Sequence, residues 1–216
     1  MAVVEQNRKK LIALITIFVV AIVVYAATNV ISQTEISEFP QPKEIKSENG
    51  ELHTSLEVKI SPNTIVDPIS GEVREINTPT YDGTLTGPTL RVKPGDTMFI
   101  DIVNKLPKNP PNQRKGTSLA FPHDPFTTNL HTHGLTVSPD GISDNVFRKM
   151  EPGGTHNPVE IIISDDHQTG TFWYHPHKHG SVSFQFFGGM SGFLIIEGGE
   201  GTLDDVPEVK AAKYLM

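Results

Sequence analysis

Two short runs of the chain each contain a His-x-His pair, and each run is flanked by residues that favour β-strands. Side chains in a strand alternate between its two faces, so the paired histidines of one run point the same way. The pairs are His131 with His133, and His175 with His177. If the two strands lie side by side, four imidazoles converge, and imidazole is a favoured ligand of copper, zinc, iron and nickel. Five of the nine histidines lie in these runs, so the sequence predicts a metal site.

Short β-type segments separated by Gly, Pro and Asn turns fill most of the chain after residue 50. About seven or eight such strands indicate an all-β fold, a Greek-key β-sandwich. A hairpin turn is expected at Pro68-Ile-Ser-Gly71, and a second strand pair is expected around Pro94-Gly95. The expected strands cover residues 52–60, 65–76, 89–93, 97–103, 130–137, 159–164, 171–175 and 192–197.

Residues 181–187 have the pattern of a short helix or a bend. Three aromatic side chains lie in this segment, namely Phe184, Phe186 and Phe187. Because large aromatic side chains are mostly buried in folded proteins, we expect these three in the core.

The N-terminus has the pattern of a targeting segment. A basic flank, Arg8-Lys9-Lys10, precedes an uncharged and mostly apolar run over residues 11–31. A helix of about 20 apolar residues is long enough to cross a bilayer. The basic flank predicts a cytoplasmic N-terminus, with the remainder of the chain outside. A cleaved signal peptide is the alternative, because Val24-Tyr25-Ala26 offers a small-residue cleavage site. The body is expected to be membrane-anchored and extracytoplasmic, or exported after cleavage.

Four segments are expected along the chain. Residues 1–31 are a cytoplasmic stub with a transmembrane or signal-anchor helix, and residues 32–50 are a polar tether. Residues 51–200 form the β-sandwich domain. Residues 201–216 are a C-terminal tail or the start of a further domain.

Composition excludes several classes of function. The net charge of −7 argues against nucleic acid as a partner. The chain has no cysteine, so it forms no disulfide, iron–sulfur cluster or Cys-based zinc site. It also cannot hold a blue-copper centre by itself, because that centre needs a Cys thiolate.

Four motifs carry a resemblance to a known family. They are Gly-Pro-Thr-Leu-Arg-Val at 87–92 followed by Pro-Gly-Asp at 94–96, Asn-Leu-His-Thr-His-Gly-Leu at 129–135, Glu-Pro-Gly-Gly at 151–154, and Gly-Thr-Phe-Trp-Tyr-His-Pro-His-Lys-His-Gly at 170–180. Together they resemble the N-terminal cupredoxin (plastocyanin-like) domain of multicopper oxidases, the laccase and copper-efflux-oxidase group. The resemblance covers roughly residues 81–198 and implies a cupredoxin-like sandwich.

The resemblance implies a role for each histidine of the two pairs. His131 would ligate the type 2 copper, while His133, His175 and His177 would ligate the type 3 copper pair. They would supply half of a trinuclear cluster that reduces dioxygen to water with electrons from a small reductant. Asp140 would assist proton delivery. A turn role for Asp140 is the alternative, and for the histidines the alternative is burial as hydrogen-bonded core side chains.

Other side chains near the motifs have simpler expected roles. Trp173 and Tyr174 are expected in the core and in the wall of the cluster, and His179 behind the ligands. The remaining histidines are expected on the surface or in loops: His53, His123, His156 and His167.

The resemblance is incomplete, because the motifs of a later cupredoxin domain are absent from the chain. These motifs supply the type 1 copper and the remaining cluster ligands. We therefore expect a fragment, a subunit of a split oxidase whose partner carries the type 1 copper, or a domain kept for copper binding. The corresponding functions are an oxidase component, a copper-binding or copper-buffering module, or a structural domain with a vestigial site. Zinc would bind the same imidazoles.

Overall fold

A computed structural model of the protein describes Thr16 and residues 41–67, 69–111, 123–199 and 201–210. Apart from Thr16, the expected membrane or signal helix at residues 1–31 lies outside these described residues. Among the residues that are described, no helix has the length and apolar character needed to cross a bilayer. Contacts divide the chain into residues 1–40 and residues 41–216, and the second unit contains the strands given below.

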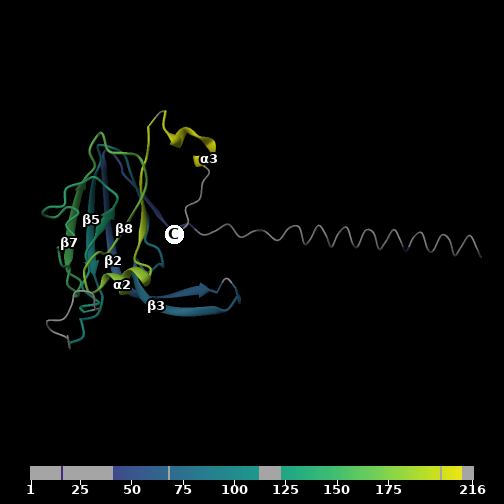
Figure 1. Cartoon of the computed structure of the whole chain (residues 1–216), viewed down its shortest axis with the longest axis vertical. Coiled ribbons are helices and arrows are strands. Elements are labelled where there is room, and N and C mark those ends of the chain that lie inside the picture. The colour runs from purple at the N-terminus through teal and green to yellow at the C-terminus, as the bar shows by residue number, and fades with distance from the viewer. Residues whose placement is uncertain (1–15, 17–40, 68, 112–122, 200, 211–216) are drawn as a thin grey trace, which may run out of the picture. The chain divides into compact units, whose positions relative to one another are not determined.

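Two β-sheets make up this second unit (Figure 1), so the expected all-β architecture is confirmed. One sheet has the strand order β1-β4-β9-β8-β6 and the other has the order β3-β2-β5-β7. The first contains β1 (Glu44–Lys46), β4 (Thr89–Val92), β9 (Gly192–Ile196), β8 (Gly170–His175) and β6 (His131–His133). The second contains β3 (Val73–Tyr81), β2 (Glu51–Val66), β5 (Thr97–Asn104) and β7 (His156–Ile162). The helical segments described in the unit are short: α2 (Val182–Phe187), η1 (Leu203–Asp205) and α3 (Pro207–Lys210).

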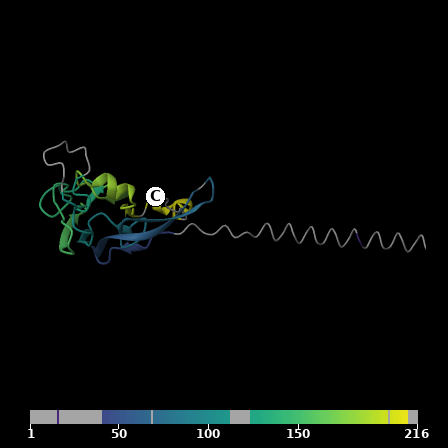
Figure 2. The ribbon, with the colours of Figure 1, turned by 90° about the horizontal axis from the view of Figure 1, so that it is seen from below.

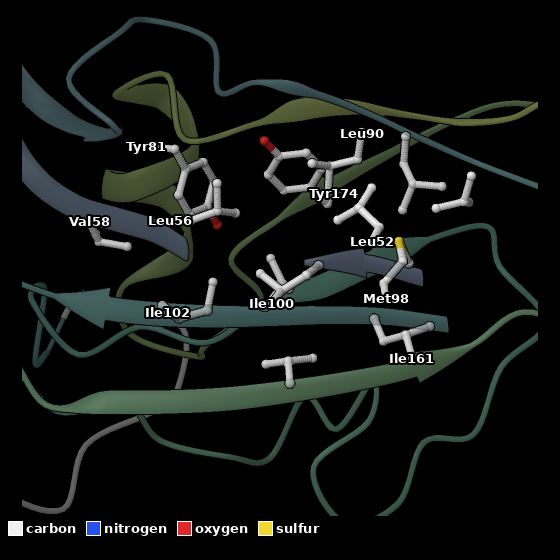
Figure 3. Packing of buried hydrophobic residues seen from close by; sticks show 14 of the residues in the cluster. Leu52, Leu56, Val58, Tyr81, Leu90, Met98, Ile100, Ile102, Ile161 and Tyr174 are labelled. Carbon is white, nitrogen blue, oxygen red and sulfur yellow. The ribbon is translucent and has the colours of Figure 1, made fainter. Parts of the chain in front are cut away.

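Alternating apolar side chains from the two sheets meet in one core (Figure 3). Leu90 and Tyr174 come from the first sheet, and Met98, Ile100 and Ile161 come from the second. Each of these side chains is at most 1% exposed. Burial of one such side chain stabilises the fold by roughly 1.5–3 kcal/mol. The core therefore fixes which face of each strand points outward.

Tyr174 fixes β8 firmly within this core. Its hydroxyl donates a hydrogen bond to the carbonyl oxygen of Pro88 at 2.7 Å, and its ring lies 5.4 Å from the ring of Tyr81. Burial raises the pKa of Tyr174 well above its ordinary value, so the phenol stays neutral. Gly192 of β9 is the pairing partner of Tyr174, and because it has no side chain it leaves room for the tyrosine ring. The two neighbours of Tyr174 in β8, Trp173 and His175, consequently face the opposite side.

The expected hairpin at Pro68–Gly71 is confirmed and is longer than the sequence pattern indicated. Strand β2 continues to Val66 and pairs with β3 down to Val73. The carboxylate of Asp67 accepts hydrogen bonds from the backbone nitrogens of Ile69 and Ser70, which closes the turn. The outer part of this hairpin runs beyond the other strands (Figure 2).

The expected pairing of the strands around Pro94-Gly95 is wrong. Strands β4 and β5 follow each other along the chain but belong to different sheets. The carboxylate of Asp96 accepts a hydrogen bond from the backbone nitrogen of Lys93 at 2.7 Å, and Gly95 has a φ of 88°. This tight turn carries the chain from one sheet to the other, so the apolar residues of both strands reach the shared core.

The three phenylalanines of α2 were expected in the core, and this expectation is wrong. Phe184, Phe186 and Phe187 are 42%, 37% and 88% exposed. The buried side chain of the helix is Gln185, whose amide nitrogen donates to the carbonyl oxygens of Pro125 and Thr127. Buried carbonyl groups need donors, and this glutamine supplies them where an apolar side chain would not.

The boundaries of the four segments expected from the sequence, at residues 31, 50 and 200, stay predictions. Strand β1 lies inside the expected tether at residues 32–50 and pairs in parallel with β4. The Nε of Arg91 donates to the carboxylate of Glu44 at 2.9 Å across this pair.

We predict that Gly192→Ala destabilises the protein. A Cβ at Gly192 would lie 2.5 Å from Cε1 of Tyr174 and closer still to Cζ and Oη. Because the ring is held on all sides, we expect a loss of about 1–3 kcal/mol in the free energy of unfolding, measured by chemical denaturation of the full chain. Gly199→Ala is the matched control, since nothing lies within 4 Å of its Cβ position. Equal stability of the two variants would contradict the prediction.

Candidate metal centre

The two histidine runs lie side by side, as the His-x-His pattern requires. Strand β6 pairs with β8 in antiparallel register, with His131 opposite His175 and His133 opposite Trp173. One ligand atom from each of His131, His133 and His175 lies within 4.8 Å of the others. Nδ1 of His133 and Nε2 of His175 are 3.3 Å apart. Three imidazoles therefore converge on the outward face of the pair.

His177 lies beside these three but outside the 4.8 Å set. Its ring centroid is 5.1 Å from that of His131 and 5.9 Å from that of His175. Its backbone nitrogen donates to Oδ1 of Asn129 at 2.6 Å, which fixes the chain at this point. Its Nδ1 is buried and has no hydrogen-bond partner. A buried polar atom without a partner costs free energy, and a metal ion bound to this nitrogen would remove that cost.

Hydrogen bonds set the protonation state of the other imidazoles. Nδ1 of His175 lies 2.8 Å from the carbonyl oxygen of Pro176, and Nδ1 of His131 lies 3.0 Å from Oδ2 of Asp144. Both oxygens only accept, so both Nδ1 atoms carry protons, and in the neutral form of each ring it is Nε2 that offers the lone pair to a metal. Burial lowers the pKa of His175 to about 4, and the neighbouring histidines act in the same direction. Its imidazole is therefore neutral and ready to ligate at neutral pH.

Asp144 is a site residue that the sequence reasoning missed. Its carboxylate contacts His131 and also accepts a hydrogen bond from the backbone nitrogen of Thr132 at 3.0 Å. Asp140, the acid singled out from the sequence, is exposed in the turn, where its backbone oxygen accepts from the nitrogen of Ser143. A single sequence contains no signal that separates these two aspartates, because the choice depends on how the loop folds back.

An aromatic wall borders the convergent histidines. The indole of Trp173 stacks on His175 with a centroid distance of 4.2 Å and on His133 at 4.8 Å. Phe186 of α2 lies 5.5 Å from Trp173 and 5.7 Å from His175. His133 itself is exposed, so the wall covers one side of the site and leaves another open.

Asn129 joins the site to the loop that carries Asp144. Its side-chain oxygen accepts from His177, and its side-chain nitrogen donates to the carbonyl oxygen of Val146 at 2.6 Å. The first histidine run, the second run and the loop at residues 138–148 are therefore tied together by one amide.

The remaining histidines lie mostly where they were expected. His53 and His156 are exposed on the second sheet, next to Glu51 and Asp101 respectively. His179 is exposed, with its ring 6.2 Å from that of His177. His167 lies in the loop before β8, which agrees with the expected surface or loop position, but its side chain is buried, with 7% of its surface exposed. Its ring nitrogens form hydrogen bonds with the backbone nitrogen of Thr136 and the carbonyl oxygen of Gln168, and these hydrogen bonds hold the ring in its buried position.

We predict that the metal-free protein loses stability as the pH falls from about 6.5 towards 4. The pKa of His175 is lowered from 6.5 to about 4 in the folded protein. In this window the unfolded chain takes up a proton at His175 that the folded chain does not, so protonation favours unfolding. Urea denaturation at a series of pH values should show a shallower pH dependence for His175→Gln than for the wild type. His53→Gln, on the other sheet, is the control, and an unchanged slope in His175→Gln would refute the prediction.

Sequence comparison identifies relatives of this domain. Residues 121–201 match the family model described as multicopper oxidase. The chain is 32% identical over 121 residues to the multicopper oxidase mco of Staphylococcus haemolyticus (strain JCSC1435), covering 56% of this chain and 22% of that protein. It is 33% identical over 121 residues to copper resistance protein A of Pseudomonas syringae pv. tomato, covering 55% and 16% of the two chains. The chain therefore spans about a fifth of the length of these relatives.

Solved structures show the same fold. The laccase of Pediococcus acidilactici Pa5930 matches with a TM-score of 0.55 at 20% identity, over 74% of this chain and 30% of that chain. The laccase-like multicopper oxidase CueO of Ochrobactrum sp. matches with a TM-score of 0.53 at 22% identity, with the same coverage. Family model, relatives and fold agree with the histidine motifs and support a cupredoxin-like domain of multicopper oxidase type in this chain.

Proposed function

We propose that this chain is an exported copper-binding component of a multicopper oxidase and supplies half of a type 2 and type 3 trinuclear cluster. The observation that carries the proposal is the convergence of His131, His133 and His175, whose ligand atoms lie within 4.8 Å of one another. His177 would be the fourth ligand, and the buried Nδ1 of its partly exposed side chain, which has no hydrogen-bond partner, supports this role.

The donor set fits copper. Neutral imidazoles bind copper in both of its common oxidation states, and the chain has no thiolate that would compete. When bound, copper would supply the electron transfers that reduce dioxygen to water. The chain itself orients the imidazoles, because Pro176 fixes the tautomer of His175 and Asp144 fixes that of His131.

Asp144 would also hold charge and protons next to the cluster. Its side chain is 11% exposed, and it accepts from both Nδ1 of His131 and the backbone of Thr132. The negative charge favours cations on the far side of the His131 ring. Asp140, which is exposed and lies four positions earlier in the chain, stays the residue predicted to assist proton delivery.

The open side of the site supports a partner that completes it. His133 is exposed, and Phe187, also exposed, has its ring 5.9 Å from that of Phe186 in the aromatic wall. An exposed apolar patch beside open ligands is typical of an interface. We propose that a second cupredoxin-type domain covers this patch, supplies the remaining histidines and carries the type 1 copper. A small reductant and dioxygen would be the substrates of the assembled enzyme.

The location of the protein follows from the N-terminal pattern. We propose that the domain lies outside the cytoplasm, anchored by a helix at residues 11–31 or released after signal cleavage. Protease accessibility of the domain in intact spheroplasts would test this placement.

We predict that the full chain, purified in detergent and loaded with Cu(II), retains copper after dialysis against a weak chelator. The double variant His131→Ala, His175→Ala should lose it, because two of the three convergent ligands are gone. The matched control is His53→Ala, His156→Ala, which removes two exposed histidines of the other sheet. Copper retention by the His131, His175 variant would contradict the proposed site, and zinc competition would settle the metal preference.

Oxygen consumption separates the oxidase from a copper-buffering module. Co-expression with a Cys-containing cupredoxin domain that carries the missing motifs should give consumption of dioxygen in the presence of a phenol. Retained copper without oxygen consumption for any such partner would favour buffering.

We predict that Asp144→Ala weakens copper binding by about 10–100-fold, because the supporting hydrogen bond to His131 is lost. Competition with a colorimetric chelator measures this affinity. Glu75→Ala removes an exposed carboxylate of β3 and is the control. Equal affinity of the two variants would show that Asp144 does not support the ligand.

A further inference from the structure

A buried histidine outside the proposed ligand set holds the turn that follows His133. Nε2 of His167 accepts a hydrogen bond from the backbone nitrogen of Thr136 at 2.9 Å. Its Nδ1 lies 2.8 Å from the carbonyl oxygen of Gln168, to which it donates. An amide nitrogen only donates and a carbonyl only accepts, so a single neutral tautomer satisfies both contacts.

The same histidine packs against the strand that carries His175. The ring of Phe172 in β8 meets the ring of His167 edge-on at a centroid distance of 5.7 Å. Phe172 also lies under Gly134, where a Cβ would come within 3.0 Å of the phenylalanine Cδ1. Gly134 has a φ of 89°, which favours glycine and lets the chain turn directly after His133. His167 and Phe172 thus form the support beneath this turn.

Strand β6 needs such a support. It has only three residues, it lies at the end of its sheet, and among the described strands it pairs with β8 alone. His133 is its last residue and is the exposed member of the three convergent histidines. Few hydrogen bonds of the strand itself therefore fix where His133 points.

We propose that His167 is a positioning residue for the copper site. Through Thr136 and Phe172 it fixes the turn after β6, and so it sets the place of the His133 imidazole relative to His175. The inference rests on the proposed copper-binding function and adds a residue that does not itself touch the metal.

Two substitutions separate the hydrogen bond from simple packing. His167→Gln places an amide oxygen near the position of Nε2, so the hydrogen bond from Thr136 is kept. His167→Phe keeps a ring beside Phe172 and loses both hydrogen bonds. Ile161→Val in β7 removes a methyl group from the core and serves as the control for lost stability.

The main measurement uses the metal-free full chain. Imidazole NMR resonances of His133 and His175 report the positions of the rings without any metal. We expect His167→Phe to shift the His133 resonances, while His167→Gln and Ile161→Val leave them close to the wild type. Unchanged His133 resonances in His167→Phe, or an equal shift in Ile161→Val, would overturn the inference.

Copper binding gives a second and separate result. We expect His167→Phe to lower the Cu(II) affinity about tenfold or more, and His167→Gln to retain it. A wild type that binds no copper, with His133 shifted in His167→Phe, would end the proposed function and leave the positioning role standing. A wild type that binds copper, with affinity and His133 resonances unchanged in His167→Phe, would end the positioning role alone.

Discussion

The pairing of β6 with β8 is the constraint on which the metal centre depends. His131 faces His175 in this register, and the residues between the histidines, Thr132 and Tyr174, face each other on the inner side. A slip of β6 by one residue would turn His131 and His133 towards the core and bring Thr132 to the outer face, so the imidazoles of the two strands would no longer share one face. Since Tyr174 is fully buried and bonded to Pro88, the hydrophobic core enforces the register that gathers the ligands.

Around this strand pair, single polar side chains link segments that are distant in sequence. Asn129 connects His177 with the loop that contains Asp144, and Gln185 connects α2 with the segment before Asn129. These amides are buried and saturate backbone groups, so they are costly to disturb. The arrangement places His131, His133 and His175 on strands, where position is well defined, and leaves loops to supply hydrogen bonds that orient the rings.

Strand periodicity predicted the parts of the protein that depend on local pattern. The β-sandwich, the hairpin at Pro68–Gly71 and the adjacency of the His-x-His runs all follow from it. Features set by long-range contacts could not be predicted. The choice of Asp144 depends on loop folding, the burial of His167 depends on Thr136, and the exposure of Phe187 depends on Gln185 taking the inner side of α2. The separation of β4 and β5 into different sheets could not be predicted either, because the same tight-turn sequence can join two strands of a hairpin or carry the chain from one sheet to the other.

The stacking of Trp173 has a consequence for how this protein can be observed. It is the only tryptophan of the chain, and its indole rests on the rings of both His175 and His133. All tryptophan fluorescence of the protein therefore comes from an indole whose ring centroid lies 4.2 Å from that of His175 and 4.8 Å from that of His133. Paramagnetic Cu(II) bound there would quench that emission, whereas closed-shell Zn²⁺ would leave it bright. Tryptophan fluorescence of the protein would therefore distinguish bound Cu(II) from bound Zn²⁺.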